Sequence, residues 1–238
     1  MNNHPICFAS LGPGDPDLMT LKTLKAIRHA DIVFVPSTTG DDGRESSRAA
    51  DIVTANVPDA PIRTFRLPMS RDRRRAMTAY GEVFDAAVSA WSEGRRVVIG
   101  VEGDVSIYAS VHYVMDMMVG RGIAVEQLPG IPSFIAAAGT GRLSLVSQQE
   151  WLLVMPGLED GAALTRALDS GCVVVLMKLS GSGQAVKDYI AANPGNTYYY
   201  IENASSPASY HTADPGEITS RHFPYFSLMI VRRKDRVG

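Results

Sequence analysis

Small, flexible and acidic residues gather where short apolar runs of the sequence end. Gly12-Pro13-Gly14-Asp15 follows the apolar run 6–9, and Glu102-Gly103-Asp104 follows the apolar run 96–100. Glycine allows a sharp turn and a close approach of the backbone to a ligand, and a carboxylate can bind an amino group or hydroxyls. Because α/β proteins bind ligands at the carboxyl ends of parallel strands, these segments predict a small-molecule site.

The first segment does not match a nucleotide-binding fingerprint. The dinucleotide motif needs a third glycine three residues after the second, where this sequence has Asp17, and no Gly-Lys-Ser/Thr phosphate-binding sequence occurs. A Gly-Pro-Gly turn by itself is usually structural. Asp104 also has a structural interpretation, because an aspartate that precedes a helix commonly caps its N-terminus.

Alternating strand and helix patterns predict an α/β fold around these segments. Apolar runs predict N-terminal strands at 6–9, 31–36, 96–100 and 125–128. Amphipathic patterns predict helices at 18–28, with Leu21 on the buried face, and at 74–93, with Met77 on the buried face. This strand-helix order indicates a mostly parallel sheet with right-handed crossovers.

The second half of the chain predicts another α/β domain. Strands are expected at 152–155, 172–177, 197–201 and 225–231, with helices at 162–168 and 184–191. No helix is evident between the last two strands, which favours a mixed C-terminal sheet. The dense turn Pro129-Gly130-Ile131-Pro132 predicts a boundary between domains 1–129 and 130–238.

Composition limits the class of partner. Asp+Glu 25 against Lys+Arg 23 gives a formal net charge of −2, which argues against a general nucleic-acid-binding surface. We expect no secretion signal, no membrane-spanning segment and a cytoplasmic location. Cys7 and Cys172 lie in strand-like runs, so we expect reduced core thiols, and the spacing of the histidines predicts no metal site.

Four motifs in order resemble the tetrapyrrole methylase family. The Gly12-Pro13-Gly14 turn is one, and the others are 102–108, 126–133 and 174–178. The resemblance covers essentially the whole chain, including the final strand. It implies a two-domain α/β enzyme that transfers methyl groups from S-adenosylmethionine to carbons of small tetrapyrroles, with its active site in the interdomain cleft.

One segment narrows the resemblance. Leu67-Pro68-Met69-Ser70-Arg71-Asp72, just before the long helix, resembles the branch of the family that methylates C20 of precorrin-2, with or without cobalt, in cobalamin biosynthesis. Two alternatives stay open. A related branch methylates other ring carbons, and another member of the family acts on ribosomal RNA. The net charge argues against the RNA alternative.

The resemblance also implies particular site residues and an assembly state. Arg71 and Tyr108 are the expected substrate-binding residues, and no catalytic base is assigned. For Tyr108, a packed aromatic on the core face of a helix is an alternative that is favoured at least as strongly. The family implies a homodimer. The expected S-adenosylmethionine-binding residues are Pro13, Glu102, Gly103, Asp104, Ile107, Pro132, Ser133, Met177 and Ala204.

The sequence departs from the family pattern at three positions. Phe8 and Ser10 occur where many relatives have glycine, and Val105 replaces the proline of the usual Gly-Asp-Pro. A side chain in place of glycine is expected to restrict how closely a ligand approaches the backbone. We interpret the departures as variation within the family. A non-catalytic binding protein would be favoured only if these three residues abolished cofactor binding.

Overall fold

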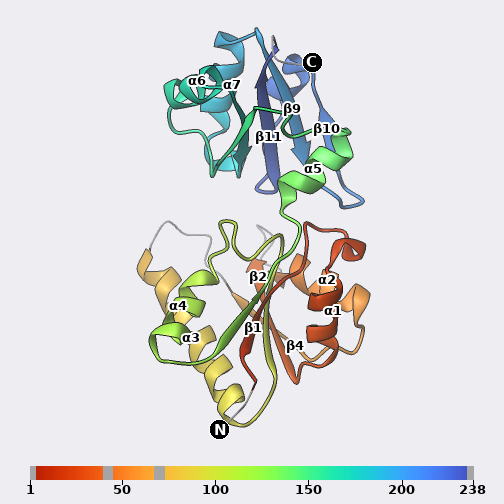
Figure 1. Ribbon diagram of the computed structural model, residues 1–238, viewed down its shortest axis with the longest axis vertical. Helices are drawn as coiled ribbons and strands as arrows, with labels where there is room; N and C mark the ends of the chain where they lie inside the picture. The colour runs from red at the N-terminus through yellow and green to blue at the C-terminus, as the bar shows by residue number, and fades with distance from the viewer. Residues whose placement is uncertain (1–3, 40–44, 67–72, 235–238) are drawn as a thin grey trace. The chain divides into compact units, whose positions relative to one another are not determined.

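The structure is a computed structural model that describes residues 4–39, 45–66 and 73–234, without the side chains of residues 73–76. The chain divides into two compact units, Met1–Ser133 and Phe134–Gly238. Each unit has its own sheet and its own buried core (Figure 1).

Unit 1 contains a sheet with strand order β3-β2-β5-β1-β6, in which β4 also pairs with β2. All of its pairs are parallel except the short β2–β3 pair. Its strands are β1 (Ile6–Ser10), β2 (Ile32–Thr39), β3 (Glu45–Ser46), β4 (Ile62–Arg66), β5 (Val97–Val101) and β6 (Val125–Leu128). Its helices are η1 (Pro16–Leu18), α1 (Leu21–Arg28), α2 (Arg48–Asn56), α3 (Arg73–Ser92) and α4 (His112–Gly120).

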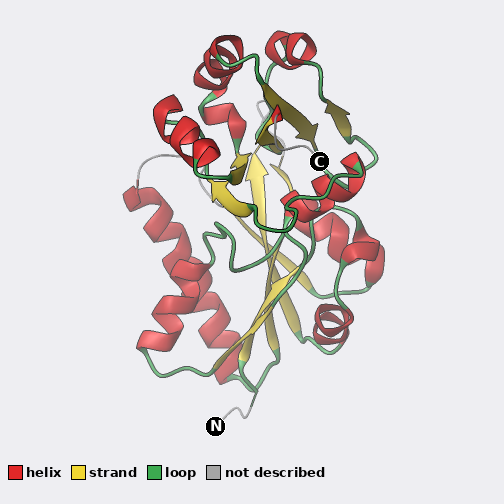
Figure 2. Cartoon of the chain, turned by 45° about the horizontal axis from the view of Figure 1, so that its top comes forward, coloured by secondary structure: helices red, strands yellow, loops and turns green. Residues whose placement is uncertain are grey.

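Helices cover both faces of the unit 1 sheet (Figures 1 and 2). Alternate residues of β1 point to opposite faces, as in any strand. Phe8 packs with α3 and α4 in one core cluster, whereas Cys7 and Ala9 pack with α1 and α2 in another. The sheet is therefore buried on both sides, which explains why its central strands are continuously apolar.

Unit 2 contains a mixed sheet with strand order β10-β9-β11-β8-β7. Strands β7 and β8 are parallel, and the other pairs are antiparallel. The strands are β7 (Trp151–Met155), β8 (Cys172–Met177), β9 (Asn196–Glu202), β10 (Tyr210–Thr212) and β11 (Ser227–Arg233). The helices are α5 (Ser133–Gly141), α6 (Gly161–Asp169), η2 (Leu179–Gly181), α7 (Gly183–Ala192) and α8 (Pro215–Ser220).

The predicted fold class is confirmed, with one mostly parallel and one mixed sheet. Several local predictions are wrong. Helix α8 lies between β9 and β11, where no helix was expected. It begins at Pro215 with Asp214 as its N-cap, but its sequence is short and has little apolar periodicity, so the pattern did not predict it. Leu21 is 73% exposed and Met77 is 40% exposed, whereas the buried residues of α1 are Thr23 and Ile27. In α1, a three-residue spacing drifts around a helix with 3.6 residues per turn, so it misplaced Leu21. In α3 only Met77 was misplaced among these positions, because Tyr80, Phe84 and Ala87 of the same predicted face are buried.

Candidate active site

Three strand ends meet at one edge of the unit 1 sheet. Strands β5 and β6 flank β1 in parallel, so their carboxyl ends lie together. The first two motifs are joined by backbone hydrogen bonds, in which Gly12 N donates to Gly103 O at 3.2 Å and Gly103 N donates to Gly12 O at 2.6 Å. Pro13 directly follows this exchange. The fold therefore brings together segments that lie about 90 residues apart, as the parallel-sheet argument predicts.

Gly12 and Gly103 both adopt a backbone conformation that favours glycine. Their φ angles are +85° and +80°, in the left-handed region. A Cβ atom on Gly12 would meet the Leu18 carbonyl oxygen at 3.0 Å, so Gly12 is packed against its own turn. A Cβ atom on Gly103 would meet nothing within 4 Å. Gly103 therefore borders open space, where a ligand can lie against the backbone.

Asp104 ties the second motif to the third. One carboxylate oxygen, Oδ1, accepts hydrogen bonds from the Ser106 backbone N–H at 2.8 Å and from the Ser106 hydroxyl. The other, Oδ2, accepts from the Gly130 N–H at 2.6 Å. Burial acts to raise the pKa of Asp104, but these donors outweigh it and hold the pKa below its usual value. Asp104 does not cap the following helix, because α4 begins at His112 with Val111 as its cap residue.

Two of the departures from the family pattern are joined by a hydrogen bond. The Ser10 hydroxyl accepts from Val105 N at 2.9 Å and donates to the Leu128 carbonyl at 2.7 Å. Phe8, Ser10 and Val105 are all 0% exposed. These side chains point into unit 1 and do not border open space, so the Ser10 hydroxyl connects β1 to the segment that follows β5 and to the end of β6 inside the unit.

Gly130 lies in the third motif and in the predicted boundary turn, and it is a candidate site residue that the sequence did not single out. Besides donating to Asp104, it packs against Ser10, because a Cβ atom on Gly130 would lie 2.4 Å from the Ser10 Cβ. Only glycine fits this contact. The Pro/Gly-rich sequence around position 130 indicated a turn. The close approach of Gly130 to Ser10 depends in addition on β1 and β6 being neighbours in the sheet.

Glu102 forms an ion pair that the sequence did not predict. Arg48 of α2 lies 3.1 Å from a Glu102 carboxylate oxygen, and the Glu102 side chain is 19% exposed. Burial raises the pKa of Glu102 to about 7, although the nearby Arg48 guanidinium acts to lower it. Glu102 is therefore the candidate site carboxyl that changes protonation near neutral pH, and Arg48 is its positioning partner.

Tyr108 is displayed at the surface rather than packed in the core. It precedes α4, is 45% exposed and has a φ of +50°. The alternative that Tyr108 lies on the core face of that helix is therefore wrong. A bulky residue at positive φ is uncommon and is found disproportionately at functional sites. Ile107, directly before it, is half-buried and its N–H donates to the Asp104 carbonyl at 3.1 Å.

Met177 and Ala204 lie at the same end of the unit 2 sheet. Met177 ends β8 and pairs with Leu228, whereas Glu202 ends β9 and pairs with the neighbouring Ser227. Ala204 follows two residues later and is 7% exposed. The fold thus brings together two of the expected binding residues that are 27 positions apart in the sequence.

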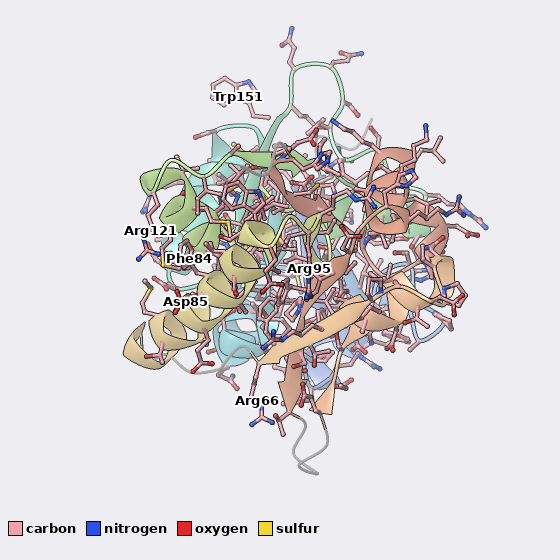
Figure 3. All side chains as sticks on the ribbon, turned by 90° about the horizontal axis from the view of Figure 1, so that it is seen from below. Arg66, Phe84, Asp85, Arg95, Arg121 and Trp151 are labelled. Carbon is pink, nitrogen blue, oxygen red and sulfur yellow. The ribbon has the colours of Figure 1, made fainter. Side chains whose placement is uncertain are left out.

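The remaining expected site residues are Pro132, Ser133 and Arg71. Pro132 and Ser133 are half-buried at the start of α5. Arg71 lies outside the described residues. Of the neighbouring arginines, Arg66 lies 3.7 Å from Glu45 at the outer part of unit 1 (Figure 3), and Arg63 lies over the Phe34 ring at 5.6 Å.

Residues 4–39, 45–66 and 73–234 contain neither a metal-binding cluster nor a membrane-spanning helix. Within these ranges, no group of three or more histidine, cysteine, aspartate or glutamate residues could hold a metal ion. None of the helices in the same ranges is long and apolar enough to cross a membrane. Cys7 is buried and Cys172 half-buried, and both are free thiols.

Comparison with known proteins identifies the family. The family model of the tetrapyrrole (corrin/porphyrin) methylases matches residues 5–217. The chain belongs to the tetrapyrrole methylase family. The resemblance deduced from the motifs is therefore confirmed, and the glycine-rich strand ends described above are those of a methylase of this family.

Several curated relatives of this methylase are named for C20 methylation of precorrin-2 or of cobalt-precorrin-2. A probable cobalt-precorrin-2 C(20)-methyltransferase from Methanocaldococcus jannaschii is 31% identical over 71% of this chain and 69% of its own length. The cobalt-precorrin-2 C(20)-methyltransferase of Salmonella typhimurium is 25% identical over 98% of both chains. A precorrin-2 C(20)-methyltransferase from a Sinorhizobium species is 26% identical over 92% of this chain and 91% of its own.

Solved structures show the same fold at lower sequence identity. A cobalt precorrin-4 methyltransferase is 19% identical, with a TM-score of 0.72 over 95% of this chain and 94% of its own. A uroporphyrin-III C-methyltransferase from Thermus thermophilus, complexed with S-adenosylhomocysteine, is 18% identical, with a TM-score of 0.70 over 98% of this chain and 100% of its own. These likenesses support the two-unit architecture of this methylase.

Proposed function

We propose that this tetrapyrrole methylase transfers a methyl group from S-adenosylmethionine to C20 of precorrin-2, or of cobalt-precorrin-2, and so forms the precorrin-3A skeleton in cobalamin biosynthesis. The observation that carries the proposal is full-length similarity to enzymes of that name, which extends over 98% and 92% of this chain. A relative named for C11 methylation aligns over only 60% of the chain. C20 is therefore the favoured position.

The residues present suit S-adenosylmethionine. In unit 1, Gly103 borders open space at the end of β5, where backbone groups can contact a folded small molecule. The backbone around it is held by the Gly12 exchange and by Asp104. Met177 supplies a polarizable apolar side chain. The proposed binding residues in both units are Pro13, Glu102, Gly103, Asp104, Ile107, Pro132, Ser133, Met177 and Ala204.

The chemistry requires alignment more than acid-base catalysis. S-adenosylmethionine would supply a methyl group from its sulfonium: a nucleophilic ring carbon bonds to the methyl carbon in line as the methyl–sulfur bond breaks, and S-adenosylhomocysteine leaves. The chain's task is to hold donor and acceptor rigidly, and the hydrogen bonds of Ser10 and Asp104 stiffen the three strand ends for this purpose. No general base is assigned.

The acceptor is a polycarboxylate, so arginine is the side chain best suited to bind it. Arg71, in the segment that resembles the C20 branch, is the proposed carboxylate-binding residue. Tyr108, exposed and held at positive φ beside Ile107, is proposed to orient the macrocycle. The exposed ring offers an aromatic face to a planar ligand.

The proposed partner is a small tetrapyrrole rather than nucleic acid or a membrane, which agrees with the net charge of −2. A cytoplasmic homodimer is the expected working form, on family resemblance alone. The interdomain location of the active site is likewise a prediction from the family.

The test is an anaerobic methyl-transfer assay followed by mass spectrometry. The purified protein and S-adenosylmethionine are incubated with precorrin-2 and with cobalt-precorrin-2 in separate reactions. A gain of one methyl group, located at C20 by NMR with a ¹³C-labelled donor, is the expected result. Methylation at C11 or another carbon would assign the protein to a related branch, and methylation of ribosomal RNA alone would refute a tetrapyrrole substrate.

A further inference from the structure

A buried ion-pair network lies at the base of the Ala204 turn in unit 2. The Arg221 guanidinium donates two hydrogen bonds to Glu202, at 2.6 Å to Oε1 and 3.1 Å to Oε2. The Tyr200 hydroxyl, whose residue is 0% exposed, donates to the same Oε1 at 2.7 Å. Arg221 also lies over the Tyr210 ring at 3.9 Å. Glu202 is therefore held from two sides by defined, directional contacts.

The turn that follows Glu202 has an unusual backbone. Asn203 has a φ of +46° and Ser205 a φ of +57°, although neither is glycine. Such conformations cost energy and persist where neighbouring contacts hold them. Here the Asn203 N–H donates to the Phe226 carbonyl at 2.8 Å, and the Ser206 N–H donates to the Asn203 carbonyl at 3.1 Å. Ala204 lies between the two left-handed residues.

We infer that Glu202 is a positioning residue, which fixes the Ala204 turn in the conformation that binds the methyl donor. Glu202 is the last residue of β9 before the turn, and its side chain ties that strand end to Arg221 at the end of α8. The inference rests on the proposed function, because it takes Ala204 as a contact of S-adenosylmethionine. Nothing in the motif pattern singled out Glu202, Arg221 or Tyr200.

The negative charge of Glu202 is paired with the positive charge of Arg221. Burial acts to raise the pKa of Glu202, but the Arg221 and Tyr200 donors outweigh it and keep the pKa below its usual value. The carboxylate is therefore ionised when it accepts these hydrogen bonds. Replacing it with the neutral amide of glutamine keeps its size but weakens both contacts.

Unit 2 offers a matched control at the opposite end of the same sheet. Arg232 pairs with Glu150 at 2.7 Å, and the Glu150 side chain is 14% exposed compared with 10% for Glu202. Arg232 is in register with Thr197 at the start of β9, whereas the Ala204 turn follows the end of β9. Glu150→Gln thus removes a similar buried charge without touching the turn.

The experiment compares binding with stability. The dissociation constant for S-adenosylhomocysteine is measured by calorimetry, and the melting temperature by scanning calorimetry, for the wild type, E202Q and E150Q. We expect similar losses of melting temperature in the two variants. Only E202Q should weaken binding, by about tenfold, which equals the ~1.4 kcal/mol of one charge-assisted hydrogen bond. Tyr200→Phe, which deletes one hydroxyl and keeps the ion pair, is the milder variant and should weaken binding less.

The outcomes separate the two proposals. If the wild type binds S-adenosylhomocysteine and E202Q and Tyr200→Phe bind it as tightly as E150Q does, the positioning role is wrong and the proposed function stands. If the wild type itself does not bind the molecule, the proposed function fails, and the inference fails with it. A loss of binding confined to E202Q and Tyr200→Phe supports both.

Discussion

The hydrogen bond between Ser10 and Val105 joins two departures from the family pattern and makes them mutually dependent. The usual proline at position 105 has no N–H to donate, and the usual glycine at position 10 has no hydroxyl to accept. We predict that Ser10→Ala and Val105→Pro are strongly non-additive in stability. The structure specifies the reason, because the Val105 N–H is buried and donates to the Ser10 hydroxyl at 2.9 Å.

The size of the effect follows from burial. Ser10→Ala removes two hydrogen bonds and leaves the buried Val105 N–H unsatisfied, a loss of about 2–4 kcal/mol. Val105→Pro alone removes one bond, a loss of about 1–2 kcal/mol. In the Ser10→Ala background, the proline also removes the unsatisfied N–H. The double variant should therefore cost about 1–2 kcal/mol less than the sum of the single variants.

The assay can be confined to unit 1. The chain has 2 tryptophans, and they divide between the units as Trp91 in α3 and Trp151 in β7. Trp151 is 70% exposed, and Figure 3 shows its side chain standing clear of the ribbon, so Trp151→Phe should be well tolerated. In that background, tryptophan fluorescence during urea unfolding reports on unit 1 alone, and the free energy of unfolding is obtained for each member of the cycle.

Ile52→Val supplies a control cycle. Ile52 is buried on the opposite face of the unit 1 sheet, in the core cluster that contains Cys7 and Ala9. Its substitution costs about 1 kcal/mol and should add to Ser10→Ala within about 0.5 kcal/mol. The reasoning would be refuted if the Ser10–Val105 cycle were additive to the same precision as this control.

Three further predictions concern other site residues. Because burial raises the pKa of Glu102 to about 7 from 4.5, the folded state binds more protons than the unfolded chain between these values, and stability falls as the pH rises through this range. Glu102→Gln should abolish this loss, on the order of 3 kcal/mol, when calorimetric unfolding is compared at pH 5 and pH 8; an unchanged pH profile contradicts it. Gly103→Ala and Gly94→Ala, both at positive φ with nothing within 4 Å of an added Cβ, should each cost about 1–2 kcal/mol, but only Gly103→Ala should weaken S-adenosylhomocysteine binding in calorimetry. Arg71→Ala should weaken tetrapyrrole binding and leave S-adenosylmethionine binding unchanged. If the wild type and this variant bound the tetrapyrrole equally well, the assignment of Arg71 would be wrong.

Much of the fold follows from local patterns. Continuous apolar runs located the central strands, because a strand buried on both faces must be apolar throughout. Short edge elements escaped this reasoning. Strand β4 at the edge of unit 1 is half-exposed, and helix α8 is only 6 residues long, so neither imposes a clear hydrophobic period on its sequence.

The motifs also predicted that the candidate site is a set of strand ends, since glycine-rich turns after apolar runs are a local signal, and the structure brings these strand ends together. The roles within the set are not local. That Asp104 binds the Gly130 N–H, or that Glu102 pairs with Arg48, depends on which strands and helices become neighbours. The exposure of Tyr108 likewise depends on where α4 begins. The sequence does not indicate that start, because the cap residue Val111 makes no side-chain hydrogen bond to the helix.

The sequence by itself therefore determined the class of this protein, the order of its elements and the residues available for chemistry. Only the tertiary structure decided how they are used. Ser10 shows the physical reason. Alone it is a serine at the end of a strand, and whether it borders a ligand or links β1 to Val105 and Leu128 depends on the partners that folding places within 3 Å of its hydroxyl. Hydrogen bonds and close packing act over such distances, and the distances are set by the fold and not by separation along the chain.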